Sequence, residues 1–129
     1  MLRLPWVVGK GSWFYRYYIL IALKHGFVPL YSNGENWMSL IDVHDCCSLV
    51  LHLAKQSKLF KIVNLYNPSL IVRQFEFVEI ISEVLNIPVK KVSLRKRIFR
   101  DNAFNEAMRF SLKVNSIHTD LYSNYHFKI

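Results

Sequence analysis

The chain has 129 residues, of which 52% are hydrophobic and 15% aromatic, and its formal net charge is +8. This length predicts a single domain or a domain fragment over residues 1–129, and no apolar run is long enough to cross a membrane as a helix. Small domains bury proportionally less of their surface, so this apolar content predicts contact with a missing domain, a second copy or a ligand.

The positive charges are concentrated in one stretch of the second half. It contains Lys90, Lys91, Arg95, Lys96, Arg97 and Arg100. A basic stretch can bind nucleic acid, anionic lipid or a phosphorylated ligand. A solvated surface is the commoner role for such charges, so nucleic-acid binding is the least favoured of the functions considered.

Cys46 and Cys47 are the only cysteines and are neighbours in the sequence. Neighbouring positions on a helix point in different directions, so we predict neither a disulfide nor a metal pair. Reduced, buried cysteines are typical of cytoplasmic proteins, which is the location we expect. The five histidines show no metal-ligand spacing, and no metal site is predicted.

The first predicted elements are a strand and a helix. Leu2–Val8 is a short apolar run that predicts a strand buried on both faces, although Pro5 cannot donate to a sheet. Ser12 is the predicted N-cap of a helix over Trp13–His25, and Gly26 is its predicted left-handed end.

A hairpin and a second helix are predicted next. Phe27–Tyr31 and Trp37–Ile41 have the composition of strands, and the turn dipeptide Asn33–Gly34 between them predicts a hairpin. Asp42 is the predicted N-cap of a helix over Val43–Gln56.

The second half predicts further alternating elements. They are a strand at Phe60–Tyr66, a helix at Arg73–Leu85 that ends at Asn86, a short strand at Val89–Leu94, a helix at Ile98–Phe110, a short helix from Asn115 or Ser116 to Tyr122, and a strand at Tyr125–Ile129. On the Ile98–Phe110 helix, the residues Phe99, Ala103, Ala107 and Phe110 share one stripe.

Two ordered patterns carry a resemblance. The pattern R-x-P-x-x-x-G precedes the aromatic helix, and V-P-L-Y-x-x-G-x-N-x-x-S-x-x-x-V-x-D follows it. Together they resemble the extended short-chain dehydrogenase/reductase family, which includes NAD(P)-dependent nucleotide-sugar epimerases and dehydratases and enzymes of the 3β-hydroxysteroid dehydrogenase type. The matching residues are Arg3, Pro5, Gly9, Gly11, Pro29, Gly34, Asn36, Ser39, Val43 and Asp45.

The resemblance implies a fold and a role. The expected fold is α/β, or α+β for an isolated piece, with short strands and about four to five helices. It would be the substrate-binding C-terminal portion of an extended Rossmann-type enzyme. The strand at Leu2–Val8 would then keep at least one unpaired edge, where the missing sheet docks.

Two features of the complete family are missing from this sequence. Its four glycines do not form the glycine-rich strand–turn–helix that binds a dinucleotide. The family's proton donor is a tyrosine with a lysine four residues later, whose positive charge lowers the pKa of the phenol. No tyrosine in this sequence is followed by a lysine at that spacing. We therefore name no catalytic residue. We expect NAD or NADP to be bound only in the complete enzyme. The expected partner of this chain is a missing N-terminal nucleotide-binding half or a second copy. A homo-oligomer is expected.

The resemblance also implies contact residues. The nicotinamide of the cofactor would lie beside Pro5, Trp6, Val7 and Val8. A small-molecule substrate would lie beside Ser12, Trp13, Arg16, Tyr31, Asn36 and Ser39. For each of these side chains, a place in the sheet or helix core is an open alternative.

One departure bears on the substrate. Many nucleotide-sugar enzymes of this family have an arginine five residues before the valine of V-x-D, where it can hold a diphosphate. That position is Met38 here. This favours an uncharged or less anionic substrate, although the basic stretch near Arg95 could replace the arginine. A non-catalytic binding or assembly module with the same fold is the alternative function.

Overall fold

The structure, a computed structural model, describes residues 1–56, 62–94, 102–116 and 125–128. Its elements are β1 (Leu2–Arg3), β2 (Trp6–Val8), the π-helical turn η1 (Tyr15–Ile19), α1 (Leu20–His25), β3 (Val28–Tyr31), β4 (Trp37–Asp42), α2 (Val43–Ala54), β5 (Val63–Asn64), β6 (Ile71–Arg73), α3 (Gln74–Leu85), β7 (Val89–Val92) and α4 (Asn102–Arg109). This mixed α/β arrangement of short strands and four α-helices in the described residues confirms the expected fold class.

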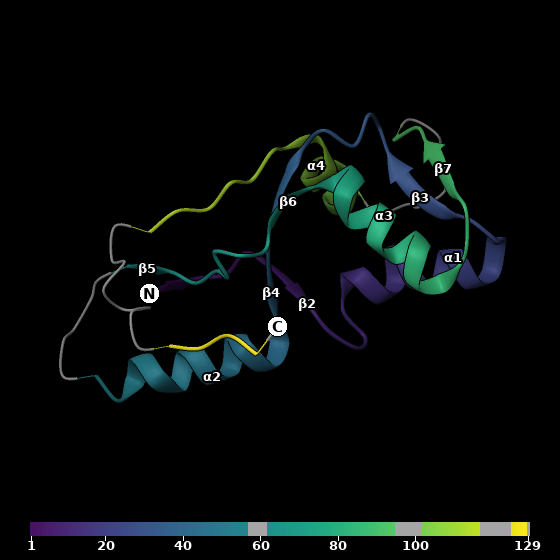
Figure 1. The fold of residues 1–129 in the computed structure, drawn as a ribbon. Helices are drawn as coiled ribbons and strands as arrows, with labels where there is room; N and C mark the ends of the chain where they lie inside the picture. Colours follow the sequence, from purple (N-terminus) through teal and green to yellow (C-terminus); the bar gives the residue numbers. More distant parts are fainter. Residues whose placement is uncertain (57–61, 95–101, 117–124, 129) are drawn as a thin grey trace.

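The helices gather at two ends of the molecule. In Figure 1, α1, α3 and α4 lie with β3 and β7 at one end, and α2 lies with β5 and the N-terminal strand β1 at the other. Strands β2 and β4 run between the two ends and pair in parallel, with Trp6 opposite Leu40 and Val8 opposite Asp42. The described residues contain no helix long and apolar enough to span a membrane.

The predicted N-terminal strand is two strands in two different sheets. β1 pairs in parallel with β5, and β2 pairs in parallel with β4. The break falls at Leu4 and Pro5, because proline has no N–H to give to a ladder. The prediction that this strand is buried on both faces was wrong, because Leu2 is 41% and Leu4 56% exposed. The unpaired edge is confirmed, since β4 is the only strand beside β2 among the described residues.

The predicted hairpin was wrong. β3 pairs in parallel with β7, whereas β4 lies between β2 and β6. The connecting turn is tight, with the Gly34 N–H donating to the Tyr31 carbonyl oxygen at 3.3 Å. Ser32 and Gly34 both have positive φ there, 58° and 72°. All four β3 residues are buried, and a strand of this kind takes its place in a parallel pair.

Several helix ends follow the predictions. The Asp42 carboxylate accepts from the His44 N–H at 2.8 Å and caps α2. Gly26 and Asn86 end α1 and α3 in the left-handed conformation. The Ser12 cap was wrong, because its hydroxyl oxygen accepts from the Gly9 N–H at 3.2 Å instead. The helix at 13–25 formed, with the π turn η1 in its middle.

α4 packs against the core through residues outside the predicted stripe. Phe104 and Met108 are buried, whereas Ala103 is exposed and Phe110 is 70% exposed. The Phe104 ring stacks on that of Tyr17 with centroids 3.8 Å apart, which fixes the face that α4 turns inward.

Some predicted features lie outside the described residues. They are residues 60–61 of the fifth strand, Phe99, the basic positions 95–100, and residues 117–122 of the last helix. Residues 125–128 are described and have no regular secondary structure. Cys46 is buried as expected, but Cys47 is exposed.

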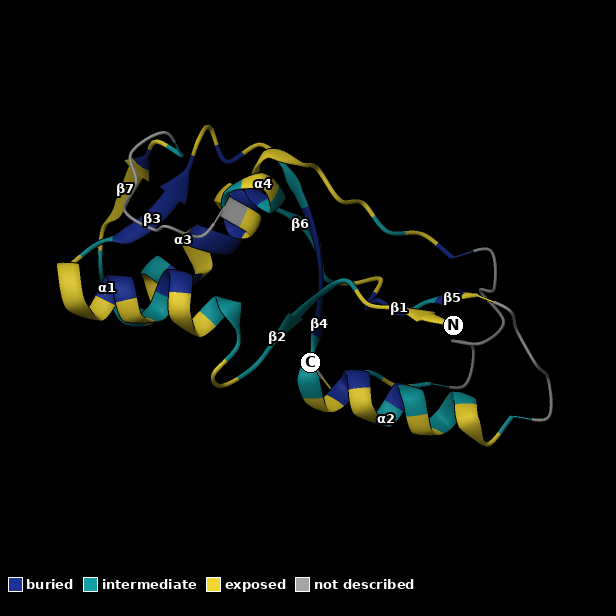
Figure 2. Ribbon diagram, turned by 180° about the vertical axis from the view of Figure 1, so that it is seen from behind, coloured by how far each residue is buried: buried dark blue, intermediate teal, exposed yellow. Residues whose placement is uncertain are grey.

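The buried side chains form two clusters. The larger, which we call the aromatic core, joins η1, α1, β3, β4, α3, β7 and α4. It includes Tyr17, Tyr18, Tyr31, Met38, Phe77, Phe104 and Met108. The smaller, which we call the α2 core, consists of Ile41, Cys46, Leu49, Val63 and Leu65. Figure 2 shows the contrast: β3 and most of β4 are buried, whereas β1 is exposed.

Candidate functional site

Strand β2, one edge of which is unpaired in the described residues, lies against the helix at 13–25 that follows it. The Trp13 indole N–H donates to the Val7 carbonyl oxygen at 2.7 Å. The ring centroids of Trp6 and Trp13 lie 4.6 Å apart, with the planes tilted by 60°. All three residues are half-buried. The structure therefore brings together two residues predicted to contact the cofactor and one predicted to contact the substrate.

A tight turn holds this junction. The Ser12 N–H donates to the Gly9 carbonyl oxygen at 3.1 Å, and the Ser12 hydroxyl oxygen accepts in return from the Gly9 N–H. A Cβ on Gly9 would lie 2.8 Å from Cγ1 of Val43, so only glycine fits against the start of α2. Pro5 and Val8 are half-buried before and at the end of β2.

Tyr31 and Asn36 are joined through a residue that the sequence did not point to. Gln74 is fully buried, and its carboxamide oxygen accepts from the Tyr31 N–H at 2.7 Å. Its carboxamide nitrogen donates to the Tyr31 carbonyl oxygen at 3.1 Å and to Oδ1 of Asn36 at 2.7 Å. Gln74 is the first residue of α3, and no sequence pattern marked it as a buried connector.

Two polar groups near this network bear on ligand binding. Asn36 Nδ2 is buried and has no hydrogen-bond partner among the described residues, and a carboxamide nitrogen carries two N–H donors that an incoming acceptor can satisfy. The Tyr31 hydroxyl donates to the Tyr17 carbonyl oxygen at 2.7 Å. Burial, with the neighbouring Tyr17 phenol, holds the pKa of Tyr31 well above its usual range, so Tyr31 stays protonated at neutral pH.

Ser39 and Arg16 lie apart from these groups. Ser39 is fully buried, and its hydroxyl donates to the Leu112 carbonyl oxygen at 3.0 Å and accepts from the Val114 N–H at 2.8 Å. The exposed Arg16 guanidinium lies 5.3 Å from the ring centroid of Tyr17. The roles of all ten contact residues stay predictions.

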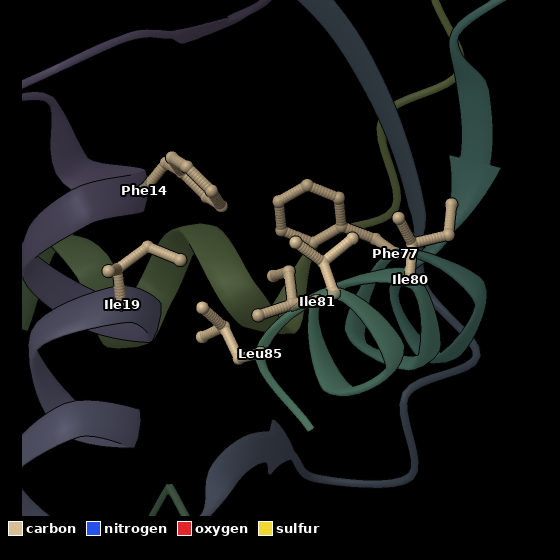
Figure 3. A pocket seen from close by; sticks show the side chains of 7 residues that line it. Phe14, Ile19, Phe77, Ile80, Ile81 and Leu85 are labelled. Atoms are coloured by element: carbon tan, nitrogen blue, oxygen red, sulfur yellow. The ribbon is translucent and has the colours of Figure 1, made fainter. Parts of the chain in front are cut away.

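An apolar pocket opens between α3 and the helix at 13–25, which contains η1. Figure 3 shows Phe14 and Ile19 on one side and the α3 side chains Phe77, Ile80, Ile81 and Leu85 on the other. Val84 completes the lining, and the volume is about 190 Å³. Every lining side chain is a hydrocarbon, so the pocket itself offers no side-chain hydrogen bond.

The departure at Met38 has a structural counterpart. Met38 is fully buried in the aromatic core, where an unpaired guanidinium would lose its hydration. Within the described residues, no three His, Cys, Asp or Glu side chains lie together where they could hold a metal ion.

No protein-family description and no curated protein matches the sequence. Solved structures match the fold. A dTDP-glucose 4,6-dehydratase from Bacillus anthracis, in complex with NAD, matches over 99% of this chain and 39% of its own, with a TM-score of 0.71 and 17% identity. The corresponding enzyme from Streptomyces venezuelae, with NAD bound, matches over 99% and 38%, with a TM-score of 0.68 and 18% identity.

A UDP-N-acetylglucosamine 4-epimerase from Methanobrevibacter ruminantium, in complex with UDP-N-acetylmuramic acid, matches over 84% of this chain and 43% of its own, with a TM-score of 0.60 and 21% identity. This chain thus spans about two fifths of the length of these enzymes. At such identities the likeness shows the fold alone, which is that of a part of the Rossmann-type dehydratases and epimerases. The resemblance inferred from the sequence is confirmed at that level.

Proposed function

We propose that this chain is the substrate-binding C-terminal portion of an NAD(P)-dependent epimerase/dehydratase or dehydrogenase/reductase and is not catalytic alone. The observation that carries the proposal is the fold likeness, over 99% of the chain, to a dehydratase solved with NAD. The unpaired edge of β2 in the described residues supports it further, because a second sheet or strand can dock there.

In this proposal the nicotinamide of NAD or NADP lies beside Pro5, Trp6, Val7 and Val8. The gathering of Trp6, Val7 and Trp13 at the unpaired edge supports the placement, since these residues form an apolar, half-buried surface. When bound, the coenzyme supplies hydride transfer. The glycine-rich segment and the Tyr–Lys pair come from polypeptide outside these 129 residues, in a cytoplasmic and oligomeric enzyme.

The substrate in this proposal is a small molecule bordered by Ser12, Trp13, Arg16, Tyr31, Asn36 and Ser39. The carboxamide nitrogen of Asn36, which has no hydrogen-bond partner among the described residues, supports a polar contact there. The alternative function is a non-catalytic assembly module of the same fold. The absence of the glycine-rich motif and of the Tyr–Lys pair from this sequence favours that alternative.

The coding sequence immediately upstream separates the two. The enzyme proposal expects a glycine-rich βαβ segment followed by Tyr-x-x-x-Lys, and expects the two pieces to co-purify when they are expressed together. It further expects amide hydrogen exchange at Trp6–Val8 to slow in that complex, because the β2 edge becomes paired. If neither the upstream sequence nor any co-purifying protein contains such a segment, the assembly module is the better account.

A further inference from the structure

We propose that the apolar pocket between η1 and α3 binds an uncharged, mainly hydrocarbon portion of the substrate. This inference rests on the proposed function and deepens it by naming the substrate class. It begins with the π turn. Phe14 and Ile19, five residues apart, both line the pocket, although positions five apart on an α-helix point about 140° away from each other.

The π turn removes that difference in direction. In η1 the Leu20 N–H donates to the Tyr15 carbonyl oxygen, five residues earlier, so residues at this spacing lie roughly one turn apart. Phe14 and Ile19 therefore face the same way, toward α3 (Figure 3). Such turns are frequent at functional sites, and here the turn forms one wall of the pocket.

The chemistry of the lining selects the ligand. Phe77 and Ile81 are buried at the α3 wall, and all seven lining side chains are hydrocarbons. A sugar hydroxyl or a phosphate moved into this pocket would lose its hydrogen bonds to water and gain none from these side chains. An alicyclic or aliphatic group loses no such bonds and gains from leaving water.

The pocket is connected to the strand proposed to hold the coenzyme. The Phe77 ring lies 6.2 Å from the Trp13 ring, and Trp13 lies 4.6 Å from Trp6 on β2. Trp13 thus contacts both Phe77 in the wall of the pocket and Trp6 on β2, the strand proposed to lie beside the coenzyme. Met38, buried where related enzymes have a diphosphate-binding arginine, agrees with an uncharged ligand.

The size of the pocket favours a small molecule. A volume of about 190 Å³ corresponds to roughly six water molecules at ~30 Å³ each, which is the scale of one saturated ring or a short chain. The exposed fraction of the side chain rises toward the rim, where Ile80 is 56% and Val84 78% exposed. A ligand can therefore enter from solvent.

The test is a titration of the ¹³C-methyl-labelled chain with cyclohexanol and, separately, with UDP-glucose. Cyclohexanol is expected to shift the methyl signals of Ile19, Ile81 and Leu85 in a saturable manner, while those of Leu51 on α2 stay fixed. UDP-glucose is expected to leave the pocket methyl signals unchanged. The inference is overturned by shifts that do not saturate or by UDP-glucose shifting the pocket methyls.

A matched pair of variants gives the second readout. Val84→Trp places a large ring at the rim and is expected to weaken cyclohexanol binding at least about tenfold. Leu51→Trp, at a similarly exposed helix position (63%), is expected to leave binding unchanged. Equal effects of the two substitutions would overturn the inference, as would pocket methyl signals that move with protein concentration alone, which would mark an interface between copies.

The outcome is separable from that of the proposed function. If the nucleotide-binding piece is found and co-purifies but cyclohexanol does not reach the pocket, only the substrate class is wrong. If cyclohexanol binds but no such piece exists, the proposed function fails.

Discussion

The aromatic core and the N-terminal strands differ in how completely this chain covers them. The Phe104 ring contacts the rings of Tyr17 and Tyr31, and Tyr18 and Met108 are also buried there. β1 and β2, in contrast, each have one strand partner among the described residues, and the residues of β1 are exposed.

The difference shows where the fold is self-sufficient. Stability in this chain comes mainly from the aromatic core, because burial of apolar surface is the largest favourable term in folding. β1, whose residues are exposed, contributes little to it, and the unpaired edge of β2 is the part that a further sheet would complete. Substitutions should therefore have large effects in one region and small effects in the other.

The largest effect is expected at Phe104. Phe104→Ala should lower the free energy of unfolding by about 4 kcal/mol, because it removes a buried ring and leaves a cavity beside Tyr17. Phe110→Ala, directly after α4 and 70% exposed, should change it by less than about 0.5 kcal/mol. Urea unfolding measures both, and similar values would contradict the assignment of α4 to the core.

Gln74 tests the polar connection inside the same region. Gln74→Ala should cost about 3 kcal/mol, because the Tyr31 backbone groups and Asn36 lose buried partners. The control is Gln56→Ala, whose amide contacts only the His52 ring at 3.0 Å among the described residues and should cost under about 1 kcal/mol. If Gln74→Ala lowered the free energy of unfolding as little as Gln56→Ala does, the hydrogen bonds of Gln74 would not stabilise the fold as proposed.

Alkaline pH tests the burial of two phenols. Burial holds the pKa values of Tyr18 and Tyr31 well above their usual range in the folded state. Both phenols stay protonated in the folded chain while the unfolded chain loses their protons above about pH 10, so this contribution to stability is complete below pH 10 and declines above it. The slope should be about 1.4 kcal/mol per pH unit for each tyrosine.

Tyr31→Phe should reduce that slope by about half between pH 10 and 11. Urea unfolding across this range gives the slope directly. An unchanged slope would show that Tyr31 ionises as readily in the folded chain as in the unfolded one.

Gly34 and Gly11 compare a crowded turn with an open one. Both have positive φ, but a Cβ on Gly34 would lie 2.5 Å from Cδ1 of Leu30, whereas one on Gly11 would meet nothing within 4 Å. Gly11→Ala should cost about 1 kcal/mol from backbone strain alone, and Gly34→Ala about 2 kcal/mol. Thermal unfolding ranks the two, and the reverse order would contradict the packing of the β3–β4 turn.

The smallest effect on stability is expected at the N-terminal strands. Leu4→Ala should change the unfolding free energy of the isolated chain by less than about 0.5 kcal/mol, because Leu4 is already exposed. It should weaken co-purification with the proposed nucleotide-binding piece. A large loss of stability in the isolated chain would show that this region is covered from within.

Local patterns allowed most elements to be predicted, and long-range pairing accounts for the errors. The caps at Asp42, Gly26 and Asn86 depend on neighbouring residues and were confirmed. The hairpin failed because Asn33–Gly34 is a local turn signal, whereas the partner of β3 is β7, more than fifty residues later.

The predicted site shows the same division. The closeness of Trp6, Val7 and Trp13 follows from a strand, a glycine turn and a helix in immediate succession, so it depends on local sequence. Gln74 gave no signal, since its burial depends on a contact across the fold. The π turn likewise has no sequence signature that we used, and the pocket that depends on it was not predicted.

The central claim, that this chain needs further polypeptide to hold the coenzyme, is tested most directly by NADH titration. Calorimetry of the purified chain should show no saturable binding up to about 1 mM, the upper end of the usual range of KM values. The same titration of the co-purified complex should show saturable binding. Saturable NADH binding by the chain alone would contradict the account.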